Sequence, residues 1–171
     1  MAARTFCLLF VLPGVLGVPG LAGDSDIDRA TLRGLTSIKV VIDQPPPEME
    51  QEGLDREHLR ATMEQKLRDG GIKIDNDAVE FLGLAIATAR SGRRSPLALV
   101  MNLGLFQVVT LNRDKTTKTV AETWGAQRLL SVAPKGRVPI VSSKGGDRET
   151  VDAVEGLLDQ FVKAYQAVNP K

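Results

Sequence analysis

The first alternating run of hydrophobic and polar positions predicts a strand. In residues 35–42 (LTSIKVVI), Ile38, Val40 and Ile42 fall on one face of an extended chain. Residues 45–47 are prolines, which cannot donate to a neighbouring strand and so end it. No basic residue flanks these prolines, and we therefore interpret them as an extended connector rather than a polyproline ligand.

A helical period follows. Leu59, Met63 and Leu67 recur every four residues, which predicts one apolar stripe along a helix. Asp55 is suited to be its N-cap, because a carboxylate accepts a hydrogen bond from a free amide of the first turn. Residues 70–71 are glycines, which end helices readily because they adopt left-handed angles without a steric penalty.

The longest apolar stretch, residues 96–113 (PLALVMNLGLFQVVTLNR), predicts a strand. Asn102 and Gln107 would be costly inside a bilayer, and the run is shorter than a membrane-spanning helix requires. One face is apolar and the other mixed, and a bend or bulge is expected near Gly104. Shorter strands are expected at residues 72–74, 79–89 and 120–124. Residues 112–119 are expected to form a polar turn, and Gly125 to interrupt the last strand.

The clearest element is the last. From residue 147 to 168 the apolar positions are spaced three, four, three, four and three residues apart, which predicts an amphipathic helix; they are Val151, Val154, Leu158, Phe161, Tyr165 and Val168. The seam also fits a short heptad pattern, but packing on the sheet is preferred because the pattern is brief. The predicted fold is α+β: a single, mainly antiparallel sheet of four to five strands with two amphipathic helices on one face, in the order β-α-β-β-β-β-α.

Residues 1–23 have the order of a secretory signal peptide. Arg4 precedes an apolar run, and small residues follow it at a cleavage point after Ala22 or Gly23. Retention of this segment as an anchor is the alternative. Residues 24–34 are expected to be a flexible acidic tail, and residues 35–171 a single domain. We therefore expect a periplasmic or secreted bacterial protein that does not span a membrane once the leader is removed.

Composition narrows the chemistry. The single cysteine, Cys7, lies within the leader, so the mature chain would have no disulfide, thiolate nucleophile or cysteine zinc ligand. Without the leader's Arg4, 21 basic residues balance 21 acidic ones. No net field would attract nucleic acid, so no nucleic-acid partner is expected.

No motif identifies a catalytic or cofactor site. His58, the only histidine, is interpreted as a surface residue near a helix start, because no nucleophile pattern accompanies it. Asp24, Asp26 and Asp28 have the spacing that opens a calcium loop, but the required glycine and glutamate are missing. We expect no catalytic residue, no metal site and no cofactor, although a hydrolase that uses carboxylates alone stays open.

Basic residues provide the candidate contact site. Arg90, Arg93 and Arg94 cluster at a predicted hairpin tip, and Lys144 precedes the last helix. They could contact an anion or a partner, although a solvated turn is the simpler interpretation because no aromatic residues lie among them. Trp124 and Tyr165 are expected to belong to the core or its rim.

The order strand, helix, strands, helix behind a signal peptide resembles small α+β proteins of the bacterial envelope. These are the lipoprotein that plugs the lipopolysaccharide transport barrel and the N-terminal domain of the Tol-system propeller protein. The segments FVKAYQAVNP (161–170) and AETW (121–124) are also similar to parts of secreted bacterial proteins of unassigned function. The resemblance covers roughly residues 35–170 and transfers no functional residue. This chain lacks the lipidated cysteine of the first relative.

Together these features lead us to expect an exported, non-enzymatic envelope protein that acts as a protein-interaction or assembly module. Its surface would be an exposed face or edge of the sheet, including the apolar run near Leu99 to Leu105. The alternative is a protein that binds a lipid or small apolar molecule in a pocket between the sheet and the two helices.

Overall fold

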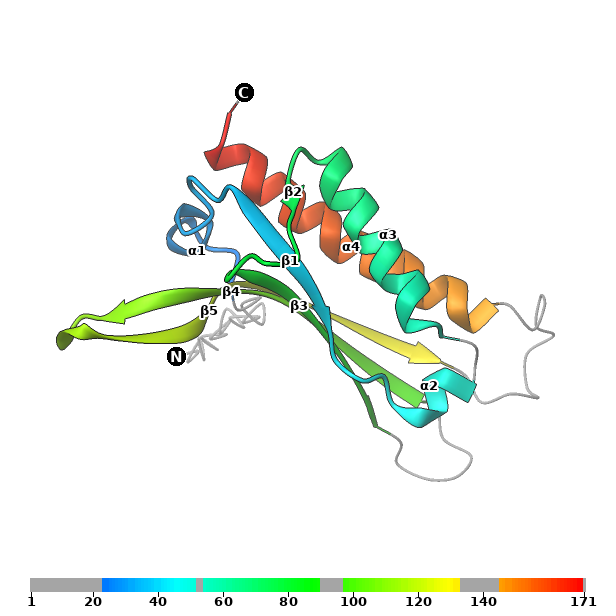
Figure 1. Cartoon of the computed structure of the whole chain (residues 1–171). Coiled ribbons are helices and arrows are strands. Elements are labelled where there is room, and N and C mark those ends of the chain that lie inside the picture. Colours follow the sequence, from blue (N-terminus) through cyan, green and yellow to red (C-terminus); the bar gives the residue numbers. More distant parts are fainter. Residues whose placement is uncertain (1–22, 52–53, 90–96, 133–144, 171) are drawn as a thin grey trace, which may run out of the picture.

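The computed structural model describes residues 23–51, 54–89, 97–132 and 145–170. Its fold is α+β, as predicted: one five-stranded sheet with two long helices against one face (Figure 1). The strands are β1 (Ser37–Ile42), β2 (Lys73–Ile74), β3 (Phe81–Ala89), β4 (Leu97–Leu111) and β5 (Asp114–Val132). The predicted leader falls, except for Gly23, outside the described residues.

The sheet is mixed, which refines the expectation of a mainly antiparallel one. Its order is β2-β1-β3-β4-β5. β3, β4 and β5 pair antiparallel over their long common length, whereas β1 is parallel to both of its neighbours. The connection after β1 contains a helix, and it is therefore long enough for the crossover that parallel pairing requires.

Two long helices, α3 (Arg56–Asp69) and α4 (Gly145–Val168), cover one face of the sheet. The predicted cap of α3 is confirmed, because the Asp55 side chain accepts a hydrogen bond of 2.9 Å from the Glu57 amide. The helix ends at Asp69 with Gly70 as its C-cap, and Gly71 follows with a φ of 89°. The stop predicted at the two glycines is also confirmed.

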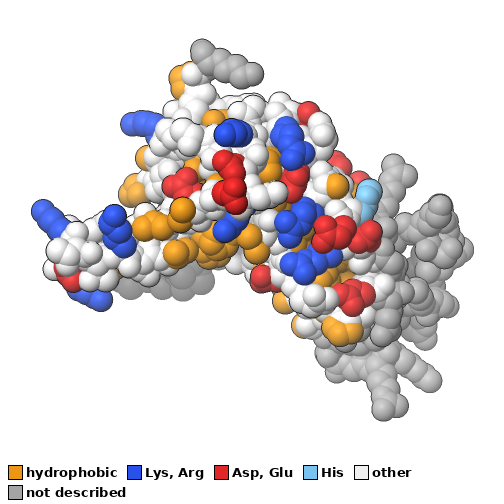
Figure 2. All heavy atoms as spheres, in the orientation of Figure 1, with side chains coloured by type: hydrophobic (Ala, Val, Ile, Leu, Met, Phe, Trp, Pro, Cys, Tyr) orange, Lys and Arg blue, Asp and Glu red, His pale blue; other side chains and the backbone are white. Residues whose placement is uncertain are grey.

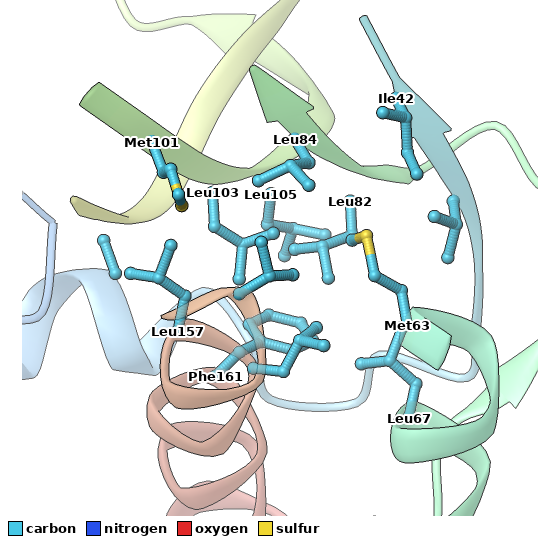
Figure 3. Close-up of a cluster of buried hydrophobic side chains, with 14 of the residues drawn as sticks. Ile42, Met63, Leu67, Leu82, Leu84, Met101, Leu103, Leu105, Leu157 and Phe161 are labelled. Atoms are coloured by element: carbon cyan, nitrogen blue, oxygen red, sulfur yellow. The ribbon is translucent and has the colours of Figure 1, made fainter. Parts of the chain in front are cut away.

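The core lies between these helices and the sheet (Figure 3). Leu105 of β4, Met63 of α3 and Phe161 of α4 are each 0% exposed. Trp124 is buried as predicted, and its ring meets Phe161 edge to face at a centroid distance of 5.0 Å. The spacing of apolar residues in α4 therefore reflects packing on the sheet rather than a coiled coil.

β4 and β5 extend beyond the rest of the sheet as a two-stranded arm, residues 107–121 (Figure 1). A shift in register after Leu105, with Thr123 as the extra residue of β5, confirms the predicted bulge close to Gly104. The polar turn predicted at residues 112–119 is limited to residues 112–113, because β5 already begins at Asp114. The threonines of this stretch suit a paired strand, and β5 also continues through Gly125 instead of being interrupted there.

The turn at the arm's tip is held by Asp114. Its carboxylate accepts hydrogen bonds from the Thr116 amide at 3.0 Å and from the Thr116 hydroxyl at 2.6 Å. These bonds, together with one from the Thr117 hydroxyl, lower the pKa of Asp114 to about 2. The hydrogen bonds of the Asp114 carboxylate thus stabilise a turn that is shorter than the predicted one.

Residues 24–34, predicted to be a flexible tail, instead fold onto the body. They contain a short helix, α1 (Asp26–Ala30), and Leu32 is fully buried. Asp24 pairs with Arg29 at 2.8 Å and accepts a hydrogen bond from Trp124 Nε1 at 3.2 Å. The acidic composition did not indicate a solvated tail, because Asp28 takes part in the cap of α1 and Asp24 attaches the segment to Trp124.

The interpretation of the prolines at residues 45–47 as an extended connector is also corrected. A five-residue helix, α2 (Pro47–Gln51), occupies part of it. Proline is tolerated in the first turn of a helix, because its missing amide would have had no helical partner there. None of the helices in the described part of the chain is both long enough and apolar enough to cross a membrane.

Candidate binding groove on the open sheet face

The sheet has a second face, which we call the open face because no helix of the described residues covers it (Figure 1). The alternation of each strand determines what it carries. Leu82, Leu84 and Leu103 point to the helices, so the residues between them point to the open face. The open face is thus built from a different set of side chains along the same strands.

A row of glycines crosses this face. Gly83 of β3 pairs with Gly104 of β4, which pairs with Gly125 of β5; Val41 of β1 pairs with Gly83 and completes the row. We call this row the glycine rung. Val41, Gly83 and Gly104 of this rung form the floor of a hollow of about 130 Å³, the glycine groove, because the two glycines leave room above the strands. The Glu122 side chain lies over Gly125, which does not line the hollow.

The next row toward the arm forms one wall of the groove. Lys39, Phe81, Phe106 and Glu122 are partners in register across β1, β3, β4 and β5, and we call them the aromatic rung. The two phenylalanine rings stack, with centroids 4.8 Å apart and planes 9° from parallel. Lys39 Nζ lies 5.9 Å from the centre of the Phe81 ring. The wall is therefore an aromatic pair with a cation at one end and a carboxylate at the other.

The glycines make room for this wall. A Cβ added to Gly83 would lie 3.1 Å from Cε2 of Phe106, and a Cβ added to Gly104 would lie 2.9 Å from Cδ of Glu122. The Phe106 ring and the Glu122 side chain therefore lean over the glycine rung. Any residue larger than glycine at position 83 or 104 would displace the Phe106 ring or the Glu122 side chain.

Glu122 is the carboxylate at the β5 end of the groove. Desolvation raises its pKa above the ordinary value of 4.5. None of the ion pairs among the described residues includes it, so no lysine or arginine there compensates its charge. Glu122 is thus an exposed residue whose carboxylate is only partly desolvated where it leans over the glycine rung, and it has no cation partner among the described residues.

The opposite wall is polar. Asp43 and Asn102 line it with Ala85, and the Asn102 side-chain oxygen is buried without a hydrogen-bond partner. Glutamate, aspartate and this amide oxygen are all acceptors. The groove consequently has more acceptors than donors, which suits a ligand that donates hydrogen bonds or carries positive charge.

Exposed apolar side chains continue the open face. Val108 and Val120 are paired across the arm and are 45% and 55% exposed, and Leu129 near the other end of β5 is 71% exposed. Hydrophobic side chains gather at the base of the arm in Figure 2, and lysines and arginines lie near its tip. The groove thus lies within a larger surface with isolated apolar contacts.

A second hollow, of about 780 Å³, lies between the outer surfaces of α3 and α4. His58 lines it and is exposed, as predicted. Lys66 pairs there with Asp159 at 3.0 Å and with Glu155 at 3.7 Å. The charge of Lys66 in this second hollow is therefore already neutralised, whereas none of the described ion pairs includes Glu122.

The predicted contact residues are not tested by this geometry. Arg90, Arg93, Arg94 and Lys144 lie outside the described residues. Among the described residues, no group of three or more histidine, cysteine, aspartate or glutamate side chains is placed to hold a metal ion.

We predicted that the apolar run from Leu99 to Leu105 is exposed as an interaction surface, and this prediction is wrong for its leucines. Leu99 and Leu105 are 0% exposed and Leu103 is 1% exposed, because all three face the helices. The groove itself was missed. The available signal was a glycine within two predicted strands, Gly83 and Gly104, and a third, Gly125, at the end of the next one, since glycine in a strand often marks a close approach.

The sequence matches no protein-family model, and no curated protein is significantly similar to it. Among solved structures, it is similar to the PelC dodecamer from Paraburkholderia phytofirmans. A single-substitution variant of that protein is 15% identical, with a TM-score of 0.41, and the match covers 75% of this chain and 90% of that one. A second PelC structure has a TM-score of 0.37 at 15% identity, covering 76% and 88% of the two chains. Similarity at this level assigns neither a function nor an assembly state to this chain.

Proposed function

We propose that this protein is an exported, non-enzymatic module of the bacterial envelope that binds a partner protein through the open face of its sheet. The observation that carries the proposal is the difference in coverage between the two faces. One face is buried under α3 and α4, while the other carries the glycine groove, the stacked phenylalanines and exposed valine and leucine side chains. Surfaces of this composition, apolar with a few polar groups, are typical of protein interfaces.

Lipid binding between the sheet and the helices is the alternative function. The space that it requires is occupied by side chains of the core, including Leu103, Leu157 and Phe161, which are at most 1% exposed (Figure 3). A bound lipid would have to displace these residues at a large cost in packing. This supports the open face over the interior as the functional surface.

Site-specific photo-crosslinking in the producing cells tests the proposal. A benzophenone amino acid is placed at Leu129 on the open face and, as the matched control, at Lys163, which is exposed on α4. We expect a defined protein adduct from position 129 and none from position 163. An adduct only from position 163, or a lipid adduct in place of a protein one, would contradict the proposal.

Export is tested separately, by fractionation and the intact mass of the purified chain. We expect the protein in the envelope or the medium, with a mass that lacks residues 1–22 or 1–23. A full-length chain in the cytoplasm would contradict this part of the proposal.

A further inference from the structure

The chemistry of the glycine groove specifies more than a general interface. Glu122 presents a carboxylate that no described cation compensates, and Asp43 adds a second acid to the lining. Asn102 contributes an amide oxygen without a partner. An anionic ligand would be repelled here, and a purely apolar one would leave these acceptors unsatisfied.

The aromatic wall adds a second requirement. The Phe81 and Phe106 rings are stacked, and Lys39 Nζ already lies 5.9 Å from the centre of the Phe81 ring. Aromatic faces attract cations electrostatically, and a planar guanidinium also stacks on them. The wall therefore favours a flat cation over a compact one.

Size limits the ligand further. The hollow of about 130 Å³ is smaller than the pockets of roughly 300–1,000 Å³ that hold drug-sized molecules. It has room for the end of one side chain. Because the exposed apolar residues extend on both sides of it, the rest of the ligand would lie along the open face.

We propose that the glycine groove receives one arginine side chain of the partner protein, whose guanidinium pairs with the Glu122 carboxylate and lies against Phe106. This inference rests on the proposed function and specifies the chemistry of the partner. Arginine fits better than lysine because its planar fork can bond a carboxylate through two N–H groups while stacking on a ring, and because it is less strongly hydrated.

Titration with n-propylguanidinium, followed by amide NMR of the full mature chain, tests this assignment. The amides of Gly83, Gly104 and Gly125 are the reporters, because the first two line the floor of the groove and the Glu122 side chain lies over the third. We expect saturable shifts at these three amides, weaker shifts with n-propylammonium at the same concentration, and none with n-propanol.

Two variants locate the site. Glu122→Gln keeps the size of the side chain but removes its charge, and we expect it to reduce guanidinium affinity at least tenfold. Glu149→Gln makes the same change at an exposed position on α4 and should bind as the wild type does. Gly104→Ala places a methyl group where Glu122 now leans, so it should also weaken binding while its amide spectrum stays that of a folded protein.

Several results would overturn the inference. These are the absence of shifts in the wild type, equal binding by Glu122→Gln, or ammonium binding as tight as guanidinium binding. Each leaves the crosslinking result at Leu129 unaffected, so failure of the arginine assignment is distinguishable from failure of the proposed function. If crosslinking identifies a partner, substitution of its arginine nearest the adduct should abolish the adduct.

Discussion

The two faces of this sheet are made by alternate residues of the same strands, yet they follow different rules. The covered face presents large aliphatic residues such as Leu84, Leu103 and Leu105, each at most 1% exposed. The open face presents glycine at three adjacent positions in register and places a carboxylate beside them. Folding accounts for the first face, because those side chains form the core.

Folding does not account for the open face in the same way. Glycine within a strand is unfavourable, because it loses more conformational entropy and contributes no packing. A carboxylate whose pKa is raised by desolvation also opposes folding at neutral pH. Features that cost stability and recur at one place are typical of functional surfaces. This comparison supports the proposal that the open face is the binding surface.

The largest expected effect is a loss of stability when a side chain of the covered face is shortened. Leu103→Ala should lower the free energy of unfolding by about 2–5 kcal/mol, because it leaves a cavity beneath α4. Val100→Ala, on the open face of the same strand, should cost less than about 1 kcal/mol. Urea denaturation followed by Trp124 fluorescence measures both. Equal losses at the two positions would show that the open face is also part of the folded core.

A smaller effect is expected where residues 23–34 join β5. Asp24→Asn removes the ion pair with Arg29 and weakens the bond to Trp124 Nε1, so it should cost about 1 kcal/mol at pH 7. Hydrogen bonding to Arg29 lowers the pKa of Asp24. The stabilisation is therefore present above the ordinary value of 3.8 and is lost as the pH falls through the lower pKa of the folded state.

Stability measured between pH 2 and 7 checks this prediction. The difference between the wild type and Asp24→Asn should shrink in acid. A difference that does not depend on pH would assign the role of Asp24 to its shape rather than its charge.

The smallest effect, opposite in sign, is expected at Glu122. Desolvation raises its pKa in the folded state, so its contribution to stability is fully present below the unfolded pKa and is lost as the pH rises through the folded value. Glu122→Gln should therefore leave the melting temperature at pH 7 unchanged or slightly higher. Asp43 and Lys39, the other charged residues beside the groove, are the same in both proteins.

Thermal unfolding across the pH range measures this difference, with Glu149→Gln as the control of equal charge. A clear loss of stability in Glu122→Gln at pH 7 would mean that the carboxylate stabilises the fold. In that case the contrast between the two faces would no longer point to binding.

Local patterns predicted the elements of this fold well. The alternation of residues 97–111 indicated β4, and the spacing of Val154, Leu158 and Phe161 indicated a helix packed on the sheet. Asp55 and the glycines at 70–71 indicated the ends of α3. In each case the determining interaction lies within a few residues of the chain, so it is visible in the sequence.

What the sequence did not predict depends on distant partners. The parallel pairing of β1 and the attachment of residues 24–34 to the body are set by contacts with other elements, as the bond between Asp24 and Trp124 shows. The glycine groove requires Gly83, Gly104 and Gly125 to align across three strands. That alignment follows from inter-strand register and from the bulge after Leu105, neither of which a single sequence specifies.

The contact between Gly23 and β5 means that the exact position at which the leader is cleaved would change the structure of the mature protein. The Gly125 amide donates to the Gly23 carbonyl at 3.2 Å, and Gly23 has a φ of 106°, which other residues rarely adopt. Under the proposed export, a peptidase that cuts after Ala22 preserves this bond, whereas one that cuts a single residue later leaves an unpaired amide on an outer strand of 19 residues. An unpaired amide on an outer strand is a place where another chain can add, so the earlier of the two adjacent cuts would leave β5 with one more of its amides satisfied within the molecule.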